Sequence, residues 1–359
     1  MKICHLSFAR VNRTKPEAWL RRIDFFVRLL EVMAKKVEVH SVYPIGSAAS
    51  REVNRVWHHF VPNGLAHQCY PWRTFRLVRA LQPDIVIIHG LRFPWQLVLT
   101  RRAASWARLF VQHHGEAPGK WIPPWAYRAA NKHVEAFFFT SQTQALPWLQ
   151  SKSLPQHAVV HEMMEVPSVF EEYASNNHTG RQPLHFLWIG RLNANKDPLT
   201  LVRGFKHFIT QSSGATLDII YSSEELMDEV RKETGKEASI RLIPGMDHMS
   251  LLPHLQKASF IISTSHTEGS GIAVAEAMSL GCIPVLTRIP SFQFMTGDGR
   301  VGLFFTPGDA ASLATTLSHA INLDREEWRI KVQQQYESHL SATAISSKIL
   351  SVIDQVPTP

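Results

Sequence analysis

The sequence predicts an α/β protein made of two doubly wound domains, each built on a parallel β-sheet. The chain has 359 residues, 45% of them hydrophobic, which is too long for one ordinary α/β core and sufficient for two. Short apolar runs alternate with longer helical patterns in both halves, as in βαβ units. A polar segment over residues 171–183, punctuated by Gly and Pro, interrupts the alternation once and is expected to be a linker.

Near-continuous apolar runs in the first half, such as DIVIIHG and EAFFFT, are typical of parallel strands buried on both faces. The expected strands are Lys2–Leu6, Val37–Tyr43, Ile85–His89, Leu109–Gln112 and Ala136–Phe139. Helices are expected between them, over Glu17–Met33 and Trp95–Ala107. We assign residues 1–170 to a first, N-terminal Rossmann-like domain.

The alternation restarts after the linker, and residues 184–324 are assigned to a second Rossmann-like domain. Its expected strands are Phe186–Ile189, Leu217–Tyr221, Ile240–Ile243, Phe260–Ser263 and Ile283–Leu286. One helix is expected to begin at Pro198, and three more are expected over Glu224–Glu233, Ser250–Lys257 and Ile272–Leu280. Residues 325–359 would form a C-terminal helix. Because ligands of doubly wound sheets bind beyond the carboxyl ends of the strands, functional residues are expected in the loops that follow strands.

The cysteines and the hydropathy pattern favour a cytoplasmic protein. Three widely spaced cysteines, Cys4, Cys69 and Cys282, indicate neither a disulfide framework nor a zinc site. The N-terminus MKICHLSF has one positive charge and no long apolar core, unlike a secretory signal. No run approaches the roughly 18 apolar residues of a membrane span. Any membrane contact is therefore expected to be peripheral, at the inner membrane face.

The net charge of +8 is unevenly distributed. Residues 1–150 contain 21 Lys/Arg and 8 Asp/Glu, a balance of +13, and eight of the ten tryptophans; the remainder has a balance of −5. A basic, Trp-rich N-terminal half is suited to bind an anionic partner, which could be lipid headgroups, a polyanionic glycan or a phosphorylated acceptor. A solvated basic surface with Trp in the core explains the composition equally well. No nucleic-acid-binding motif is present, so nucleic acid is not expected as a partner.

The string FIISTSHTEGSGIAVAEAMSLGCIPVL predicts a site for a phosphorylated ligand. A buried strand leads into a Gly-rich loop and a helix, so backbone N–H groups at the helix N-terminus can approach an anion. The expected contacts are Gly269, Ser270, Gly271 and Ile272. Glu276, about one turn into the helix, can accept both hydroxyls of a ribose, and Glu268 lies in the loop. An ordinary βαβ unit with two solvated glutamates would share this spacing.

The string FLWIGRLNANKDPLTLVRGF predicts a second cationic loop after a strand. Asp197-Pro198 is typical of a helix N-cap followed by proline at the first helical position. Arg191 and Lys196 precede it in the loop, and an Arg with a Lys can hold a diphosphate. Taken alone, the two cations are more often simple surface charges.

These two segments together resemble glycosyltransferase family 4, the glycosyl transferases group 1. Glu268 and Glu276 match its Glu-x7-Glu signature, and Arg191 and Lys196 match the two cations that bind the donor diphosphate. At the end of the strand ARLFVQ, His114 before Gly115 corresponds to a family residue that faces the donor sugar, and His113 is the alternative. A buried histidine with only a structural role would also explain this position. The resemblance covers residues 184–321 well and residues 1–170 weakly.

The resemblance implies the GT-B fold and a retaining transfer of a sugar from a nucleotide diphosphate sugar. It also implies that the C-terminal helix of residues 325–359 crosses back to the first domain. It implies catalytic roles for His114, Glu268, Arg191 and Lys196, no metal and no cofactor. The acceptor would be a glycan, lipid-linked or phosphorylated molecule of polysaccharide or glycoconjugate synthesis. The alternative is a GT-B member that acts differently, either a nucleotide-sugar-binding subunit or an epimerase, although no additional acid and base motif of an epimerase is evident.

The sequence departs from the family pattern in three places. The glycine-rich loop expected after the first strand is absent, and Arg10, Arg13 and Lys15 stand there instead. Tyr221-Ser222-Ser223 replaces a Gly-x-Gly, and IPSFQFMTGDG, over residues 289–299, replaces a Gly-Gly-x-x-Glu segment. Contacts to the acceptor, the base and parts of the sugar therefore cannot be transferred from the family.

Overall fold

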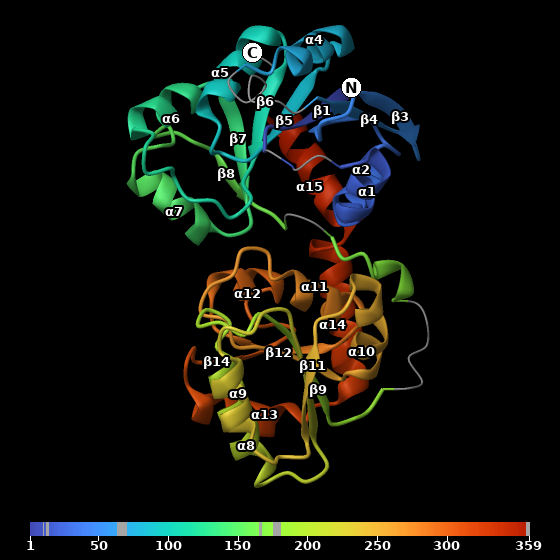
Figure 1. Ribbon diagram of the computed structural model, residues 1–359, viewed down its shortest axis with the longest axis vertical. Coiled ribbons are helices and arrows are strands. Elements are labelled where there is room, and N and C mark those ends of the chain that lie inside the picture. The colour runs from blue at the N-terminus through green and yellow to red at the C-terminus, as the bar shows by residue number, and fades with distance from the viewer. Residues whose placement is uncertain (10, 12–13, 63–69, 165–166, 175–180, 357–359) are drawn as a thin grey trace. The chain divides into compact units, whose positions relative to one another are not determined.

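The alternating apolar and amphipathic segments form two separate sheets in the computed structural model (Figure 1), which describes residues 1–9, 11, 14–62, 70–164, 167–174 and 181–356. The chain divides into two compact units. Unit 1 contains Met1–Val166 and Ala342–Pro359, and unit 2 contains Pro167–Ser341. The predicted class, α/β with two doubly wound parallel-sheet domains, is confirmed.

Unit 1 is built on a sheet of eight strands in the order β3-β4-β2-β1-β5-β6-β7-β8. The strands are β1 (Lys2–Ser7), β2 (Glu38–Pro44), β3 (Ala49–Val53), β4 (Val56–Val61), β5 (Ile85–His89), β6 (Arg108–Gln112), β7 (Val134–Phe139) and β8 (Val160–Glu162). All neighbours pair in parallel except β3, which is antiparallel to β4. Five of these strands are the expected ones, whereas β3, β4 and β8 were not predicted.

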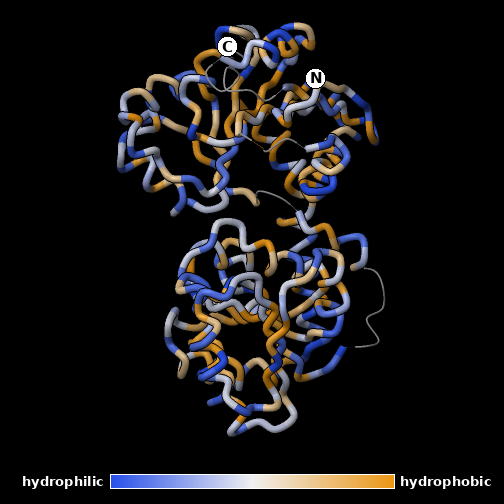
Figure 2. The backbone as a smooth tube through the Cα atoms, in the orientation of Figure 1, coloured by the Kyte–Doolittle hydropathy of each residue, from blue (hydrophilic) through white to orange (hydrophobic). Residues whose placement is uncertain are grey.

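Helices follow most strands of unit 1, as βαβ crossovers require. They are α1 (Pro16–Arg22), α2 (Asp24–Met33), α4 (Trp72–Leu81), α5 (Pro94–Ala103), α6 (Pro124–Asn131), α7 (Gln142–Gln150) and α15 (Ala342–Gln355). The single helix expected over Glu17–Met33 is divided at Ile23, whose backbone angles (φ −115°, ψ 30°) are not helical. In Figure 2 the strands at the centre of each unit are mostly hydrophobic.

Unit 2 is built on six parallel strands in the order β11-β10-β9-β12-β13-β14. The strands are β9 (His185–Gly190), β10 (Thr216–Tyr221), β11 (Ile240–Pro244), β12 (Phe260–Ser263), β13 (Ile283–Thr287) and β14 (Leu303–Phe305). The helices are η1 (Glu171–Tyr173), α8 (Pro198–Ile209), α9 (Met227–Thr234), η2 (His248–Leu251), α10 (Leu252–Lys257), α11 (Ile272–Ser279), α12 (Pro290–Met295), α13 (Ala310–Ala320) and α14 (Arg325–His339). The β9–β13 strands all lie where expected.

The division of the chain differs from the expected one at both ends of the second domain. Unit 2 begins at Pro167, inside the range of residues 1–170 that was assigned to the first domain, and it ends at Ser341, beyond the expected end at residue 324. The C-terminal helix expected over residues 325–359 is two helices that end and begin around Leu340. The first, α14, packs on α11 and α12 of unit 2, whereas α15 packs on α2 of unit 1. The two helices thus contribute their apolar faces to different cores.

Candidate functional site

The carboxyl end of the unit 2 sheet carries both loops that the sequence indicated. The strand order reverses between β9 and β12, and ligands of doubly wound folds bind at such a switch point. Residues 191–197 follow β9, and residues 264–271 follow β12. Because both strands run in the same direction, the topology brings the two loops to the same edge of the sheet.

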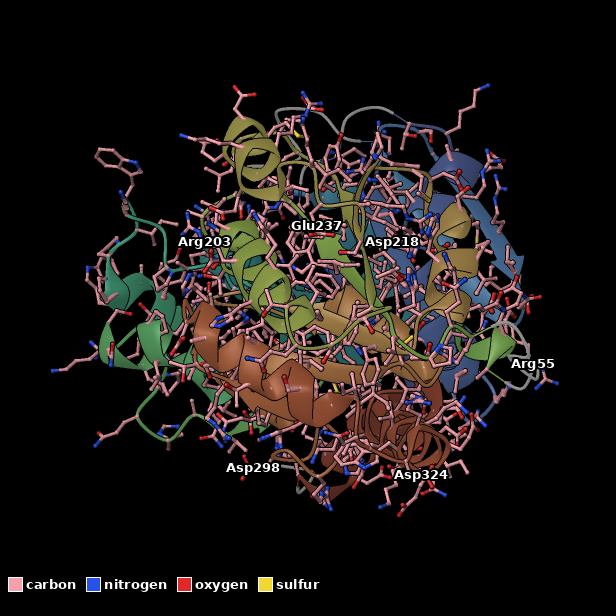
Figure 3. All side chains as sticks on the ribbon, turned by 90° about the horizontal axis from the view of Figure 1, so that it is seen from below. Arg55, Arg203, Asp218, Glu237, Asp298 and Asp324 are labelled. Atoms are coloured by element: carbon pink, nitrogen blue, oxygen red, sulfur yellow. The ribbon has the colours of Figure 1, made fainter. Side chains whose placement is uncertain are left out.

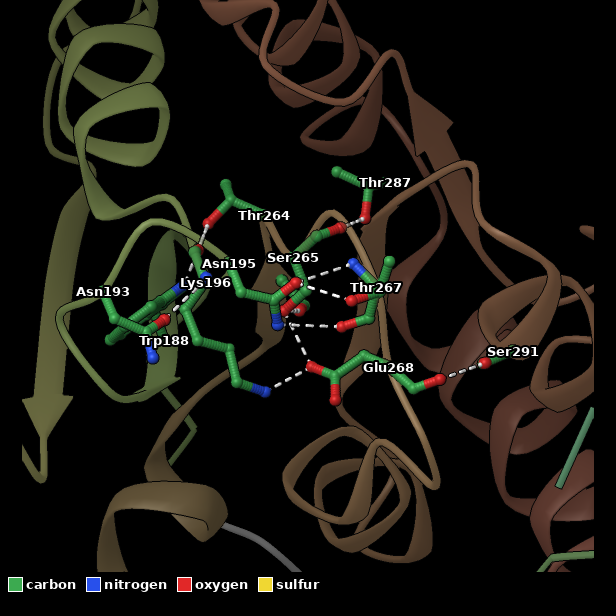
Figure 4. A network of polar contacts seen from close by, with 11 residues as sticks. Trp188, Asn193, Asn195, Lys196, Thr264, Ser265, Thr267, Glu268, Thr287 and Ser291 are labelled. Atoms are coloured by element: carbon green, nitrogen blue, oxygen red, sulfur yellow. Dashed lines mark hydrogen bonds and ion pairs between the residues drawn. The ribbon is translucent and has the colours of Figure 1, made fainter. Parts of the chain in front are cut away.

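Lys196 and Glu268, one from each loop, form an ion pair between Nζ and Oε1 (Figure 4). The same Oε1 accepts a hydrogen bond of 2.7 Å from the Oγ atom of Ser265. The two charged side chains are only 20% and 12% exposed, so their attraction is screened less than that of a surface pair. Glu268 therefore holds the Lys196 ammonium group in one place at the switch point.

Asn195 joins the two loops through both its backbone and its side chain (Figure 4). Its carbonyl oxygen accepts a hydrogen bond of 2.8 Å from the backbone N–H of His266. Its Oδ1 accepts from the backbone and hydroxyl of Thr267, at 3.1 and 2.7 Å, and its Nδ2 donates to the Thr267 carbonyl at 3.0 Å. These bonds fix the loop backbones that carry Lys196 and Glu268, so little ordering is needed when a ligand binds.

Gly271 is the N-cap residue of α11 and has a φ of +57°, in the left-handed region that favours glycine. A Cβ atom at this position would lie 3.0 Å from Cε1 of Phe292 and 3.1 Å from Sδ of Met295, both in α12. The unusual IPSFQFM segment thus packs directly on the turn. The predicted ligand contacts Gly269, Ser270, Gly271 and Ile272 lie together at this helix N-terminus, where the helix dipole favours phosphate.

Glu276 is buried in α11, and its Oε1 lies 2.6 Å from Nε2 of His248. His248 begins η2, after β11, and its ring packs edge-on against Phe170 at 5.1 Å. The carboxylate that the sequence predicts to hold a ribose is therefore oriented by an imidazole that has no counterpart in the sequence prediction.

Arg191 is exposed in the loop after β9. Its guanidinium group forms no hydrogen bond or ion pair with any residue in the described part of the chain. Of the two cations predicted to bind a diphosphate, only Lys196 is therefore brought into the network around Glu268. Asp197 confirms the expected N-cap, since its carboxylate accepts a hydrogen bond of 3.2 Å from the backbone N–H of Thr200.

His113 and His114, at the end of β6 in unit 1, have different environments. His113 is buried, and its Nε2 lies 2.6 Å from the carbonyl oxygen of Glu116. Its Nδ1 accepts a hydrogen bond of 3.2 Å from the Gly115 N–H. His114 is exposed. Both ring nitrogens of His113 are thus engaged by backbone groups, and His114 is the residue of the pair that can meet a ligand.

His114 is the outer member of a chain of three imidazoles. Its Nε2 lies 2.9 Å from Nδ1 of His89, and Nε2 of His89 lies 3.0 Å from Nδ1 of His5. Burial lowers the pKa of His5 to about 3, and burial with the neighbouring imidazoles lowers the pKa of His89 well below its usual value. Both inner rings are therefore neutral. A neutral imidazole donates from one ring nitrogen and accepts at the other, so all hydrogen bonds along the chain must run in the same direction.

A cavity of about 210 Å³ adjoins this chain within unit 1. It lies at the switch point of this sheet, between the carboxyl ends of β1 and β5. Its lining includes four aromatic side chains, two serines and two of the imidazoles: Trp19, Phe25, Phe26, Tyr43, Ser7, Ser41, His89 and His114. Of the predicted basic loop after β1, Arg10 and Arg13 lie outside the described residues, and Lys15 is the N-cap of α1.

A larger cavity, of about 360 Å³, is lined by residues of unit 2 that include Arg181, Ser259, Ile283 and Arg329. Ser259 precedes β12 and Ile283 begins β13, so this cavity lies at the amino ends of the strands. That edge is opposite to the loops described above, and we do not assign the site to it.

Two features of the described residues bear on cofactors and membranes. No group of three or more His, Cys, Asp or Glu side chains that could hold a metal ion occurs within the described ranges. No described helix is long and apolar enough to cross a bilayer. Independence from metals remains a prediction.

Residues 183–322 match the family model of glycosyl transferases group 1. The matched segment is less than half of the chain and lies within unit 2. It contains Arg191, Lys196, Glu268 and Glu276, which are the residues that carried the resemblance in the sequence.

Curated relatives align with parts of this chain. The GDP-mannose:cellobiosyl-diphosphopolyprenol α-mannosyltransferase of Xanthomonas campestris is 32% identical over 139 residues, covering 37% of this chain and 36% of that protein. The poly(glycerol-phosphate) α-glucosyltransferase of Bacillus subtilis is 35% identical over 102 residues, covering 28% of this chain and 15% of that protein. The aligned regions thus span about a third or less of the relatives' length.

Solved structures are similar to this chain over nearly its whole length. The sucrose-phosphate synthase of Thermosynechococcus elongatus has a TM-score of 0.65 and 14% identity, covering 99% of this chain and 98% of that one. The UDP-forming α,α-trehalose-phosphate synthase of Burkholderia xenovorans has a TM-score of 0.68 and 12% identity, covering 100% and 99%. The predicted GT-B fold is therefore confirmed.

Three features of the site were missed by reasoning from the sequence. They are His248 beside Glu276, Asn195 between the loops, and His5 with His89 behind His114. Asn195 stands in the motif itself, and its amide is a common bridge between loops, so its role was open to prediction. The histidines come from strands or turns distant in sequence, and only the fold shows their proximity.

Proposed function

We propose that the protein is a retaining glycosyltransferase of family 4 that transfers a sugar from a nucleoside diphosphate sugar without a metal ion. The observation that carries this proposal is the pairing of Lys196 with Glu268 at the unit 2 switch point, next to the α11 N-terminus and Glu276. A cation, a helix dipole and a buried carboxylate suit a diphosphate and a ribose at one edge of a sheet. The match to glycosyl transferases group 1 covers this same region.

In the proposed reaction, the bond from the anomeric carbon to the diphosphate breaks and a bond from that carbon to the acceptor oxygen forms on the same face. The acceptor proton passes to the departing phosphate oxygen, so no protein base is required. Lys196, with Arg191 from the same loop, stabilises the charge that develops on the leaving diphosphate. Glu268 acts beside the sugar and Glu276 binds the ribose. His114 orients the sugar.

For the acceptor we propose a lipid-linked or otherwise anionic carbohydrate at the inner membrane face, used in polysaccharide or glycoconjugate synthesis. The polyprenol-linked and poly(glycerol-phosphate) acceptors named for the two relatives support this class. The excess of Lys and Arg in residues 1–150 supports it independently.

The proposal is tested by a donor screen followed by turnover. Thermal shifts with UDP, GDP and ADP identify the base, since a ligand that binds only the native state raises the melting temperature. Transfer from the matching sugar donor is then measured with and without EDTA. We expect transfer that survives EDTA. Nucleotide binding without transfer or hydrolysis would indicate a binding subunit, conversion of the donor into its epimer would indicate an epimerase, and loss with EDTA restored by manganese would contradict metal independence.

A further inference from the structure

Three tryptophans of unit 1 expose large parts of their rings. Trp121 is 96% exposed, Trp125 is 65% exposed and Trp95 is 54% exposed. Each such ring leaves an apolar area in water that a folded protein normally buries. The three residues occur in two short segments, RFPW (residues 92–95) and KWIPPW (residues 120–125), in which aromatic and proline residues follow a cation.

The two segments lie at the same edge of the sheet. RFPW leads into α5 after β5, and KWIPPW leads into α6 after β6. Since β5, β6 and β7 are adjacent and parallel, right-handed crossovers place α5 and α6 on one face with their N-termini at the carboxyl edge. The two helices pack against each other. Trp95 and Trp125 each follow the proline that begins their helix.

Glu116 connects the loops that precede the two helices. One carboxylate oxygen accepts a hydrogen bond from the backbone N–H of Leu91, and the other accepts one of 2.8 Å from the N–H of His114. The Glu116 side chain is 12% exposed. Its charge is therefore used inside the protein to hold the loops together, and it does little to neutralise the surface around them.

The surface next to the tryptophans is basic. Glu116 is the one acidic residue among residues 91–133. Arg92 and Lys120 are both exposed, next to the tryptophans, and Arg128 is exposed one turn after Trp125. Trp indole rings favour the boundary between water and hydrocarbon, and Lys and Arg near a bilayer are attracted to anionic headgroups.

We propose that Arg92, Trp95, Lys120, Trp121 and Trp125, here named the tryptophan edge, bind the surface of an anionic lipid bilayer. A bilayer fits better than a soluble polyanion because the exposed tryptophans are flanked by Ile122, Pro123 and Pro124, which offer apolar surface and no side-chain hydrogen-bond donors. The edge continues into His114, beside the 210 Å³ cavity. If the proposed function holds, this surface presents that cavity to a lipid-linked acceptor.

The test is flotation of the full chain with vesicles of phosphatidylcholine alone and of phosphatidylcholine mixed with phosphatidylglycerol. We expect binding to the anionic vesicles that weakens with salt. Trp121→Ala with Trp125→Ala should lower the partition coefficient by roughly tenfold or more. Arg92→Gln with Lys120→Gln should lower it by about 30-fold for anionic vesicles, at about tenfold for each 1.4 kcal/mol.

The matched control is Trp106→Ala. Trp106 is 45% exposed but lies before β6, at the opposite edge, where its Nε1 donates to the Pro83 carbonyl. This variant should bind vesicles like the unaltered chain, and circular dichroism checks the fold of each variant. Absent vesicle binding, equal losses in the control, or undiminished binding of the double Trp variant would overturn the proposal. The proposal would also be overturned if the unaltered chain bound soluble dextran sulfate but no vesicles, and both double variants lost the dextran sulfate binding.

Failure of this proposal is distinguishable from failure of the proposed function. Thermal shifts with nucleoside diphosphates report on unit 2 and need no membrane. Nucleotide binding and sugar transfer to a soluble acceptor without flotation would contradict only the membrane-binding proposal. Flotation without nucleotide binding would contradict only the proposed transferase function.

Discussion

The Nε2 atom of His248 lies 2.6 Å from Oε1 of the buried Glu276 carboxylate. The imidazole comes from η2, after β11, and the carboxylate from α11, after β12. The contact leaves a carboxylate with one oxygen already oriented, and a carboxylate held in this way is well suited to accept hydrogen bonds from a diol such as a ribose.

Replacing Glu276 by Ala should weaken the binding of the free nucleoside diphosphate by about 10- to 100-fold, since a hydrogen bond to a charged group contributes about 1.5–3 kcal/mol. His248→Ala should weaken it less, because the carboxylate itself remains. Calorimetry measures both. Glu268→Ala serves as the comparison and should leave nucleotide binding nearly intact while lowering kcat. The opposite pattern for Glu268 and Glu276 would exchange their proposed roles.

Lys196→Ala should lower kcat by about 10²- to 10³-fold, the effect of removing one group that stabilises charge in the transition state. Because Glu268 holds the ammonium group in place, the losses from Lys196→Ala and Glu268→Ala should not add in the double variant. The exposed Lys232 of α9 provides the control: Lys232→Ala removes the same charge from unit 2 and should leave kcat unchanged. Strict additivity would mean that the ion pair has no part in catalysis.

The extent of successful prediction follows from what each segment contacts. Continuous apolar runs predicted ten of the strands correctly because parallel strands need little beyond apolar side chains. β4 was missed because its sequence, VWHHFV, contains two histidines. These become acceptable in a sheet only through partners from other strands: Nε2 of His59 lies 3.0 Å from Nδ1 of His40, and Tyr43 contacts His58.

The candidate site shows the same limit. Lys196, Glu268 and Gly271 were predictable because each stands in a loop directly after a strand, and the topology of a doubly wound sheet brings such loops together. Their bonding was not predictable. That Glu268 would bind Lys196, and Glu276 would bind His248, depends on side-chain directions that no spacing in the sequence specifies.

Unit 1 should lose stability as the pH falls below 6.5, before unit 2 does. Burial lowers the pKa of His5 to about 3 and, with nearby positive charges, lowers the pKa values of His58 and His59 to about 4. Between pH 6.5 and those values the unfolded chain binds protons that the folded unit does not, so each histidine removes up to about 1.4 kcal/mol per pH unit.

Unit 2 should respond only at lower pH, because its buried carboxylate Asp218, labelled in Figure 3, behaves in the opposite way. Burial raises the pKa of Asp218, but hydrogen bonds with His185 and Arg241 outweigh burial and lower the pKa to about 2. Its contribution is present above the usual value of 3.8 and is lost as the pH falls toward 2. Hydrogen exchange measured at pH 7 and pH 5 distinguishes the units, and earlier opening of the unit 2 strands would contradict this order.

The imidazole chain should fix His114 with its proton on Nδ1. Nε2 of His5 is buried without a partner, and a buried unpaired donor is costly, so we place the His5 proton on Nδ1, directed at His89. His89 then donates from Nδ1 to Nε2 of His114. Ring nitrogen shifts in NMR measure this tautomer. His5→Phe should move the His114 proton toward Nε2, whereas His5→Asn, which retains a donor, should not; an unchanged tautomer in both would show that the chain has no influence.

The transferred sugar should retain its anomeric configuration, and His114→Gln should keep part of the activity. On the proposed front-face route, the departing phosphate takes the acceptor proton, and His114 donates a hydrogen bond from Nδ1 that glutamine can partly replace. A protein base would be indispensable for in-line inversion, so loss of activity to background in His114→Gln, with nucleotide binding intact, would indicate that His114 is that base. The anomeric coupling constant of the product decides between the routes. A β-linked product from an α-linked donor would show inversion and overturn the proposed mechanism, while leaving the assignment of the diphosphate site to Lys196 untouched.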